Sequence, residues 1–298
     1  MKNNEKNNKN NQNEMQNKVV VVTGGSQGIG MCMAIEFAKL KSKVIISSRT
    51  EKDLDEVAAK IKADGGFCEP IAMDVSDFSQ VKKNFDLIIK KYSKIDVLVN
   101  CAGIYGPLGP LEINDAEKWA KTIQINLIGT VNCIKCIIPN MKKQNYGKII
   151  TMCGGGIGSI IKPNMSAYTT SKAAIAGLTE ALANELKDFN IQVNAISPGA
   201  VNTRLLDQVL QAGEAVGKDF LERAKKQKLE GGTPPEKAAE LAIFLASTKS
   251  DFVTGKVLSA VWDDYKNFEK IKDKLIKDSL YNLRRINDNT FVEVKKKK

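Results

Sequence analysis

The sequence predicts a single α/β domain with a doubly wound parallel sheet of about seven strands and helices on both faces. Short β-branched runs alternate with helical patterns from residue 18 to residue 262. Such alternation produces right-handed crossovers and a parallel sheet that is covered on both sides. This stretch shows neither a linker nor an internal repeat. A chain of 298 residues with 43% hydrophobic content is long enough for one large core.

Seven strands are predicted where apolar, β-branched runs are too short to be helices. The first of them contains four consecutive valines. The predicted strands span residues 18–23, 44–48, 67–73, 95–100, 147–153, 191–196 and 255–261. The helical patterns between them cover residues 30–40, 52–62, 81–91, 115–141, 166–187 and 234–245.

Both ends of the chain lie outside this alternating pattern. Residues 1–17 are rich in Asn and Lys and almost free of apolar side chains, which predicts a disordered tail. Residues 18–262 form the predicted domain. Residues 263–298 are polar and predict a helical extension that ends in four lysines.

Composition excludes several classes of function. The chain has no histidine, so His-based triads and most zinc catalysis are excluded. Cys133 and Cys136 lie in an apolar helical pattern and are predicted to pack rather than to bind metal. Neither a signal peptide nor an apolar run of membrane-spanning length is recognisable, so we expect a cytoplasmic protein with reduced thiols and no membrane partner. The net charge of +11 is spread along the chain, and no nucleic-acid partner is expected.

The turn after the first strand carries a glycine pattern, Thr23-Gly24-x-x-x-Gly28-x-Gly30. Glycines allow a sharp turn and a close approach of backbone to ligand. The helix that follows offers unpaired N–H groups and the positive end of its dipole to a pyrophosphate. The spacing differs from G-x-G-x-x-G, but its place directly after the first strand indicates a dinucleotide site. The candidate cofactor-binding residues here are Gly24, Ser26, Gln27, Gly28, Ile29 and Gly30.

Tyr168 and Lys172 are the candidate proton-transfer residues. They are four residues apart in a helical pattern, so their side chains share one helix face. A free phenol has a pKa of about 10 and is a poor acid or base at neutral pH. A nearby ammonium group is expected to lower that pKa, which suits the interconversion of a carbonyl and an alcohol.

Four motifs in order resemble those of the short-chain dehydrogenases/reductases, in the shorter single-domain branch of that family. They are the glycine pattern, Asn100-Cys-Ala-Gly103, Tyr168-x-x-x-Lys172, and Pro198-Gly199 followed by Thr203. The resemblance covers about residues 18–260. It implies a Rossmann-like fold and an oxidoreductase that acts on a small-molecule carbonyl or secondary alcohol. It also implies a homodimer or homotetramer, with helices 115–141 and 168–187 at the interface.

The resemblance assigns further roles. Asn100, Ala102 and Gly103 would border the cofactor, and Pro198, Gly199 and Thr203 would hold its carboxamide end. Lys172 would bind the nicotinamide ribose as well as lower the pKa of Tyr168. Asn126 matches the helix Asn that holds a water in the proton relay.

Cofactor choice is predicted from the end of the second strand. Ser48 stands where NAD-dependent members carry an acidic residue, and Arg49 follows. A carboxylate there would repel a 2′-phosphate, whereas a guanidinium suits one. We therefore expect NADP(H), with NAD(H) as the open alternative. Asp74 and Val75 match the family's adenine-contacting position.

The family serine is missing from the catalytic set. Its place, just after the fifth strand, falls on Gly154 or Gly155. Cys153 is nearby, but a thiol is a weak donor, and Ser159 could reach the site only if its loop folds back. Our hypothesis is that backbone N–H groups of the glycine run act as an oxyanion hole and that Cys153 is mainly a packing residue.

Two segments remain open. Residues 205–228 lie where the family places a substrate lid, with Gly213 and Gly217 able to give mobility. The extension after residue 262 would either pack as a helix on its own domain or cover the active site or a neighbouring subunit.

The leading hypothesis is an NADP(H)-dependent oxidoreductase in which Tyr168, Lys172 and Asn126 move the proton. The missing serine keeps a second hypothesis open, in which the chain is a cofactor-binding sensor or scaffold with little catalysis. A nucleic-acid-binding role for the basic tails is a third and weaker alternative.

Overall fold

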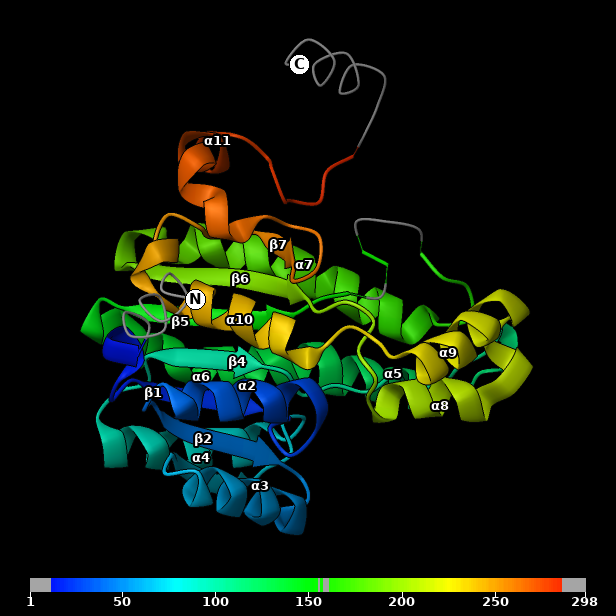
Figure 1. Cartoon of the computed structure of the whole chain (residues 1–298), viewed down its shortest axis with the longest axis horizontal. Coiled ribbons are helices and arrows are strands. Elements are labelled where there is room, and N and C mark those ends of the chain that lie inside the picture. Colours follow the sequence, from blue (N-terminus) through cyan, green and yellow to red (C-terminus); the bar gives the residue numbers. More distant parts are fainter. Residues whose placement is uncertain (1–11, 155, 158–160, 286–298) are drawn as a thin grey trace.

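The computed structural model describes residues 12–154, 156–157 and 161–285. Seven parallel strands form one sheet in the order β3-β2-β1-β4-β5-β6-β7, which confirms the predicted fold class (Figure 1). The strands are β1 (Val19–Thr23), β2 (Lys43–Ser48), β3 (Phe67–Ala72), β4 (Val97–Asn100), β5 (Gly147–Met152), β6 (Ile191–Ser197) and β7 (Val257–Ser259). The chain moves outward from β1 to β3 and then returns to β4. The strand order therefore reverses between β1 and β4, which is where ligands bind in such sheets.

Helices cover both faces of the sheet because its central strands bury side chains on both sides. All five residues of β1 and all six of β5 are buried. One core contains side chains of α2 (Gly28–Lys39), α3 (Glu51–Ala63) and α10 (Pro235–Ala246). The core on the opposite face contains side chains of α4 (Phe78–Tyr92), α6 (Gly129–Gln144) and α7 (Ser166–Leu186).

The long helix predicted at 115–141 is divided into three parts. They are α5 (Ala116–Ile123), a π-helical turn (Gln124–Ile128) and α6. Contrary to the expectation from the sequence, the continuous stretch Ala116–Gln144 has the length and hydropathy of a membrane-crossing helix. Half of its most apolar window is buried inside the domain, as in a core helix packed on a sheet.

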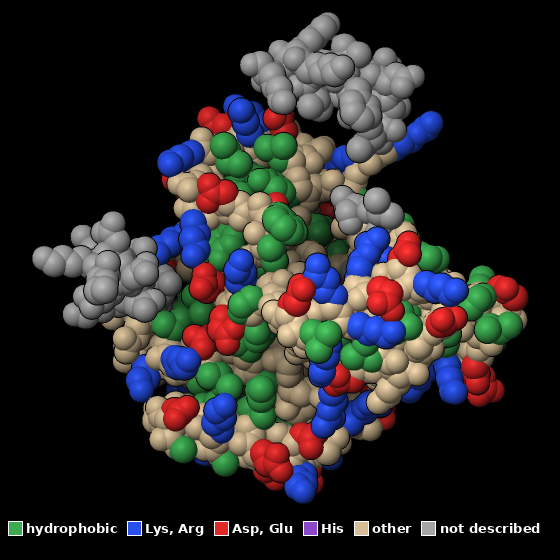
Figure 2. Space-filling model, turned by 45° about the vertical axis from the view of Figure 1, so that its right-hand side comes forward, with side chains coloured by type: hydrophobic (Ala, Val, Ile, Leu, Met, Phe, Trp, Pro, Cys, Tyr) green, Lys and Arg blue, Asp and Glu red, His purple; other side chains and the backbone are tan. Residues whose placement is uncertain are grey.

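The segment predicted as a lid folds into α8 (Arg204–Ala212), the 3-10 helix η4 (Gly213–Val216) and α9 (Lys218–Glu230). It projects beyond the carboxyl ends of the strands (Figure 1). Its apolar side chains form a separate small core around Leu206 and Val209, against which Tyr105 and Leu108 pack. Figure 2 shows basic and acidic side chains interspersed over the viewed face of the molecule, without a large patch of one sign.

The prediction of disorder is wrong for residues 12–17. Residues 12–15 form a short helical turn, and Met15 is fully buried in the core beside α2. The Ser42 hydroxyl donates to the Met15 carbonyl at 3.0 Å, and Asn17 N–H donates to the Lys41 carbonyl at 3.0 Å. Composition misled here because one apolar side chain and a few backbone hydrogen bonds dock the segment. Residues 1–11 lie outside the described residues.

The C-terminal extension packs on its own domain. It contains η6 (Tyr265–Ile271) and α11 (Lys272–Lys277), and Tyr265, Phe268 and Leu275 join the same core as α2 and α10. Val257 N–H of the edge strand β7 donates to the Tyr281 carbonyl at 2.8 Å, so the chain covers this sheet edge itself. Of the two alternatives, packing on its own domain is correct for residues 263–285, and residues 286–298 lie outside the described residues.

Candidate active site

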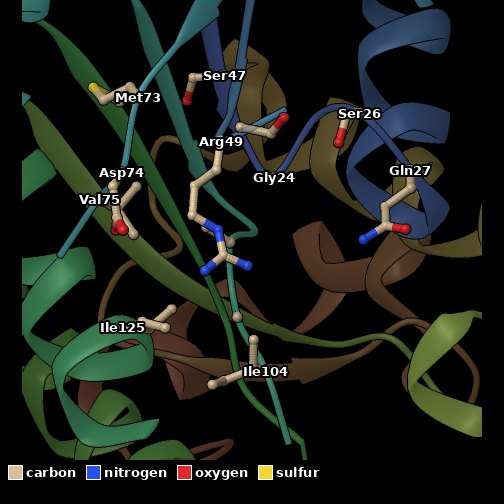
Figure 3. Close-up of a pocket in the computed structure, with 13 residues that line it drawn as sticks. Gly24, Ser26, Gln27, Ser47, Arg49, Met73, Asp74, Val75, Ile104 and Ile125 are labelled. Carbon is tan, nitrogen blue, oxygen red and sulfur yellow. The ribbon is translucent and has the colours of Figure 1, made fainter. Parts of the chain in front are cut away.

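A pocket opens at the carboxyl ends of β1, β2 and β4, at the point where the strand order reverses (Figure 3). Nine of the predicted cofactor-binding residues line it together: Gly24, Ser26, Gln27, Ser48, Arg49, Asp74, Val75, Ala102 and Gly103. The other predicted cofactor residues are not among those that line this pocket. The switch point of the sheet is the expected place for a dinucleotide.

The glycine loop fits because its backbone has no room for side chains. Gly24 has φ +67°, and a Cβ there would lie 2.8 Å from the backbone nitrogen of Ala102. A Cβ on Gly30 would collide with the carbonyl oxygen of Gly24. The loop therefore lies directly on the end of β4, and the first turn of α2 on the loop.

The first turn of α2 is free to receive an anion. Gln27 precedes the helix in extended conformation and makes no side-chain capping hydrogen bond, and the first turn contains no acidic residue. Uncapped N–H groups at a helix N-terminus favour a phosphate. Thr203, at the start of the lid, caps α8 through Leu205 N–H at 3.3 Å. Its methyl group would lie 3.1 Å from a Cβ on Gly28, so the lid begins against the glycine loop.

Arg49 extends its guanidinium into the pocket, with Asp74 and Val75 on one side and the glycine loop on the other (Figure 3). Within the described residues it makes no ion pair. The Asp74 carboxyl is held as an ion. Burial acts to raise its pKa, but hydrogen bonds from Ser76 and the positive charges of Lys121 and Arg49 outweigh burial and lower the pKa.

Buried polar atoms beside the pocket lack partners in the part of the chain that the structure describes. They are Ser47 Oγ and both side-chain amide atoms of Asn100. Thr23 Oγ1 accepts from the N–H groups of Cys101 and Ala102 at 3.2 Å each, which holds the end of β4 open beside β1. Orphaned polar atoms, an uncapped helix and a glycine cradle fit a bound dinucleotide.

Tyr168 and Lys172 lie on α7, and the Lys172 ammonium is 5.6 Å from the centre of the Tyr168 ring. Lys172 Nζ donates to the carbonyl of Met152, at the end of β5, at 2.9 Å. The expected lowering of the Tyr168 pKa is wrong for this structure. Burial raises the Tyr168 pKa, with Tyr105, Cys153 and Cys101 adding to the effect, and burial lowers the pKa of Lys172. Desolvation is the largest cause of both shifts.

Asn126 lies in the π-helical turn and connects the site's elements. Its Oδ1 accepts from Ile104 N–H at 2.8 Å, and its Nδ2 donates to the Ile104 carbonyl at 2.9 Å. The same Nδ2 donates to Ser171 Oγ at 2.9 Å, and that hydroxyl donates to the Tyr168 carbonyl at 2.7 Å. π-Turns of this kind occur frequently at functional sites. Asn126 therefore joins the loop after β4 to the helix that carries Tyr168.

The place of the missing serine is occupied by backbone. Gly154 has φ +119° and contributes no side chain. The Cys153 thiol is buried and donates to the Lys172 carbonyl at 3.4 Å, as expected of a packing residue. Gly155 and Ser159 lie outside the described residues. Pro198 and Gly199 follow β6, and a Cβ on Gly199 would lie 2.6 Å from a Val261 methyl carbon and 2.8 Å from Thr233 Oγ1.

Sequence reasoning missed several residues of the site. Ser47, Met73, Ile104 and Ile125 also line the pocket. Each is next to, or within one residue of, a predicted site residue, so adjacency to the motifs could have found them. Tyr105, whose ring packs on Tyr168, was also missed. Tyr105 could have been found from the sequence because it follows Gly103 by two residues.

Comparison with known proteins agrees with the fold and the site. A family model described as short chain dehydrogenase matches residues 18–213. The chain is 31% identical to a 3-oxoacyl-[acyl-carrier-protein] reductase of Thermotoga maritima over 244 residues, which are 82% of this chain and 96% of that protein.

Two solved structures share the architecture. NAD+-bound xylitol dehydrogenase superposes with a TM-score of 0.77 at 28% identity, covering 83% of this chain and 98% of the other. An actinorhodin polyketide ketoreductase with NADPH superposes with a TM-score of 0.74 at 25% identity, covering 82% and 95%. The chain belongs to the short-chain dehydrogenase family of NAD(P)-dependent oxidoreductases.

Proposed function

We propose that this protein uses NADP(H) to reduce a small-molecule carbonyl to a secondary alcohol, with Tyr168 as the proton donor. One observation carries the proposal: Asn126 links the loop that lines the cofactor pocket to the helix that carries Tyr168 and Lys172. Dinucleotide binding and proton transfer can therefore take place in one connected site.

The preference for NADP(H) rests on Arg49 and on the absence of an acidic residue at Ser48. The two superposed structures contain different cofactors, NAD+ in one and NADPH in the other, so the choice depends on this chain's own residues. Arg49 points into the pocket (Figure 3). A guanidinium forms charge-assisted, forked hydrogen bonds with a phosphate.

The remaining predicted residues fit a dinucleotide in the following way. The glycine loop and the first turn of α2 would hold the pyrophosphate, and Asp74 and Val75 would contact the adenine. Asn100, Ala102 and Gly103 would border the middle of the molecule, and Pro198, Gly199 and Thr203 would hold its carboxamide end. The bound cofactor supplies a hydride to the substrate carbon.

Tyr168 is suited to donate a proton in this reaction. Burial raises the pKa of its phenol, so the group is protonated at neutral pH and can give its proton to the developing alkoxide. Lys172 would bind the nicotinamide ribose and stabilise the phenolate that remains. Asn126 holds Ile104 and Ser171, and it would also hold the relay water.

The test is oxidation of NADPH and NADH against a panel of ketones, ketoacyl esters, quinones and keto-sugars. We expect turnover that Tyr168→Phe abolishes. Tyr92→Phe is the matched control, since Tyr92 lies at the end of α4 and its hydroxyl donates a hydrogen bond to Glu69 rather than to a residue of the site. Turnover that persists in Tyr168→Phe would refute the assigned role.

A second variant tests cofactor choice. Arg49→Gln should weaken NADPH binding about 10- to 150-fold, the equivalent of a charged hydrogen bond of about 1.5–3 kcal/mol, and leave NADH binding unchanged. Lys52→Gln removes an exposed cation three residues away and is the control. An equal loss of affinity for NADPH and NADH in Arg49→Gln would contradict NADP(H) specificity.

The alternative of a cofactor-binding sensor or scaffold has one observation in its favour, which is the glycine at the place of the family serine. Micromolar NADPH affinity without turnover on any compound of the panel would favour it. The hydrogen-bonded link from Asn126 through Ser171 to the backbone of Tyr168, on the helix that also carries Lys172, supports the enzyme instead.

We also propose a homodimer or homotetramer that associates through α5, α6 and α7. Half of the most apolar window of Ala116–Gln144 is not buried in the chain itself, and Ile128 is 37% exposed there. Light scattering after size exclusion gives the mass directly. A monomer at all micromolar concentrations would refute the proposal.

A further inference from the structure

The phenol of Tyr105 has an unusual position in the site. Its ring centre is 4.6 Å from that of Tyr168, and the two rings meet edge to face at 75°. This contact places a second phenol ring directly against the ring of the proton donor. Tyr105 has no assigned role so far.

Tyr105 is fixed by the backbone on both sides. Before it, both backbone groups of Ile104 are held by the side-chain amide of Asn126. After it, Gly106 has φ +74°, and a Cβ there would collide with Thr122 Oγ1, so the chain lies directly against α5. Preorganisation of this kind is what a group needs to act on a reacting atom.

Several other side-chain donors around Tyr168 are already used, although the buried Thr169 hydroxyl has no partner within the described residues. Lys172 Nζ donates to the Met152 carbonyl, Ser171 Oγ to the Tyr168 carbonyl and Cys153 Sγ to the Lys172 carbonyl. The Asn126 amide donates to Ile104 and Ser171. Tyr105 Oη, in contrast, makes no hydrogen bond within residues 12–154, 156–157 and 161–285.

Resting on the proposed reductase function, we propose that Tyr105 is a catalytic residue: its hydroxyl donates a second hydrogen bond to the substrate oxygen that Tyr168 protonates. The carbonyl gains a hydride on carbon from the cofactor and a proton on oxygen from Tyr168. The O–H bond of Tyr105 stays intact throughout and stabilises the negative charge that develops on that oxygen.

The surroundings of Tyr105 agree with this role. Burial raises the pKa of its phenol, so it remains a donor at neutral pH. The ionisation of Tyr168 is opposed by Tyr105, as expected of two phenols whose rings are in contact. The Tyr105 ring also packs against the small core of the lid around Leu206 and Val209. A shift of the lid would therefore also move the Tyr105 ring that carries the second donor.

Tyr105→Phe tests the proposal because it removes only the hydroxyl and keeps both ring contacts. We expect kcat to fall about 10²- to 10³-fold, the usual effect of losing one donor to an oxyanion, with little change in KM. Tm and NADPH affinity should remain those of the wild type, which verifies folding. A deuterated nicotinamide should then show a larger isotope effect on kcat, because the chemical step has become slower.

Ser159→Ala and Cys153→Ala are the matched controls, since they remove the other two candidate side-chain donors named from the sequence, and each should stay within about threefold of wild type. Tyr105→Phe with unchanged kcat, or with a change in KM alone, would overturn the assignment, as would a large loss in Ser159→Ala instead. These outcomes require wild-type turnover that disappears in Tyr168→Phe. An inactive wild type would refute the proposed function, and this inference with it.

Discussion

Replacing Gly24 by alanine isolates the close approach on which the cofactor pocket depends. Gly24 has φ +67°, and an added Cβ would lie 2.8 Å from Ala102 N and 2.9 Å from Ala102 Cα. Both are backbone atoms at the end of β4 and cannot move away as a side-chain tip could. Gly65 is the matched control, with φ +74° and only the tip of Lys41, Nζ, at 4.0 Å.

The two substitutions share the backbone strain but not the collision. A left-handed conformation costs an L-residue roughly 1–2 kcal/mol, so Gly65→Ala should lower the free energy of unfolding by about that amount. Gly24→Ala adds an overpacking cost of about 1–3 kcal/mol, for a total of about 2–5 kcal/mol. Displacement of Ala102 should also weaken NADPH binding at least about tenfold, the equivalent of about 1.4 kcal/mol.

Urea unfolding of both variants gives the stabilities, and quenching of protein fluorescence by NADPH gives the affinities. Gly65→Ala should bind NADPH like the wild type because it lies far from the pocket, between α3 and β3. Equal destabilisation in the two variants, together with unchanged NADPH affinity in Gly24→Ala, would refute the collision argument.

Three further predictions concern stability. Met15→Ala should lower the free energy of unfolding in urea by about 2–5 kcal/mol, because the side chain is fully buried. A loss below about 0.5 kcal/mol, within the range of surface substitutions, would mean that residues 12–17 are not docked. Phe268→Ala should lower the free energy of unfolding by about 3–5 kcal/mol. Arg284→Ala should lower it by under about 1 kcal/mol, because the ion pair of Arg284 with Glu180 is partly exposed. A larger loss in Arg284→Ala than in Phe268→Ala would show that ion pairing holds the extension. Burial raises the pKa of the Cys32 thiol from 9.0 to about 11, so the unfolded chain loses this proton first and the free energy of unfolding falls as pH rises between those values. Cys32→Ala should flatten that decline by up to about 1.4 kcal/mol per pH unit, and an equally steep decline in the variant would contradict it.

The sequence predicted the fold because its signals are local. Four consecutive valines, or a β-branched run such as 147–153, specify a buried strand whatever surrounds them. Alternation with helical patterns then leaves few topologies open. Gly24, Gly28 and Gly30 were found for the same reason, since a turn that requires glycine is written in consecutive residues.

The contacts of the site were less predictable because they join distant segments. Tyr105 and Tyr168 are separated by 63 positions, and nothing in either segment specifies that their rings meet. The expectation that Lys172 lowers the pKa of Tyr168 used their spacing alone. Burial of both groups, which depends on the whole domain, reversed the direction.

By itself, then, the sequence determined the parallel sheet, the glycine loop at its first turn and the helix face shared by Tyr168 and Lys172. Only the tertiary structure decided that Met15 docks in the core, that the extension covers the edge of β7, and that Asn126 joins the cofactor loop to α7. The physical reason is that periodicity and turn chemistry act between near neighbours in the chain, whereas burial and hydrogen-bond partners depend on segments that meet only after folding.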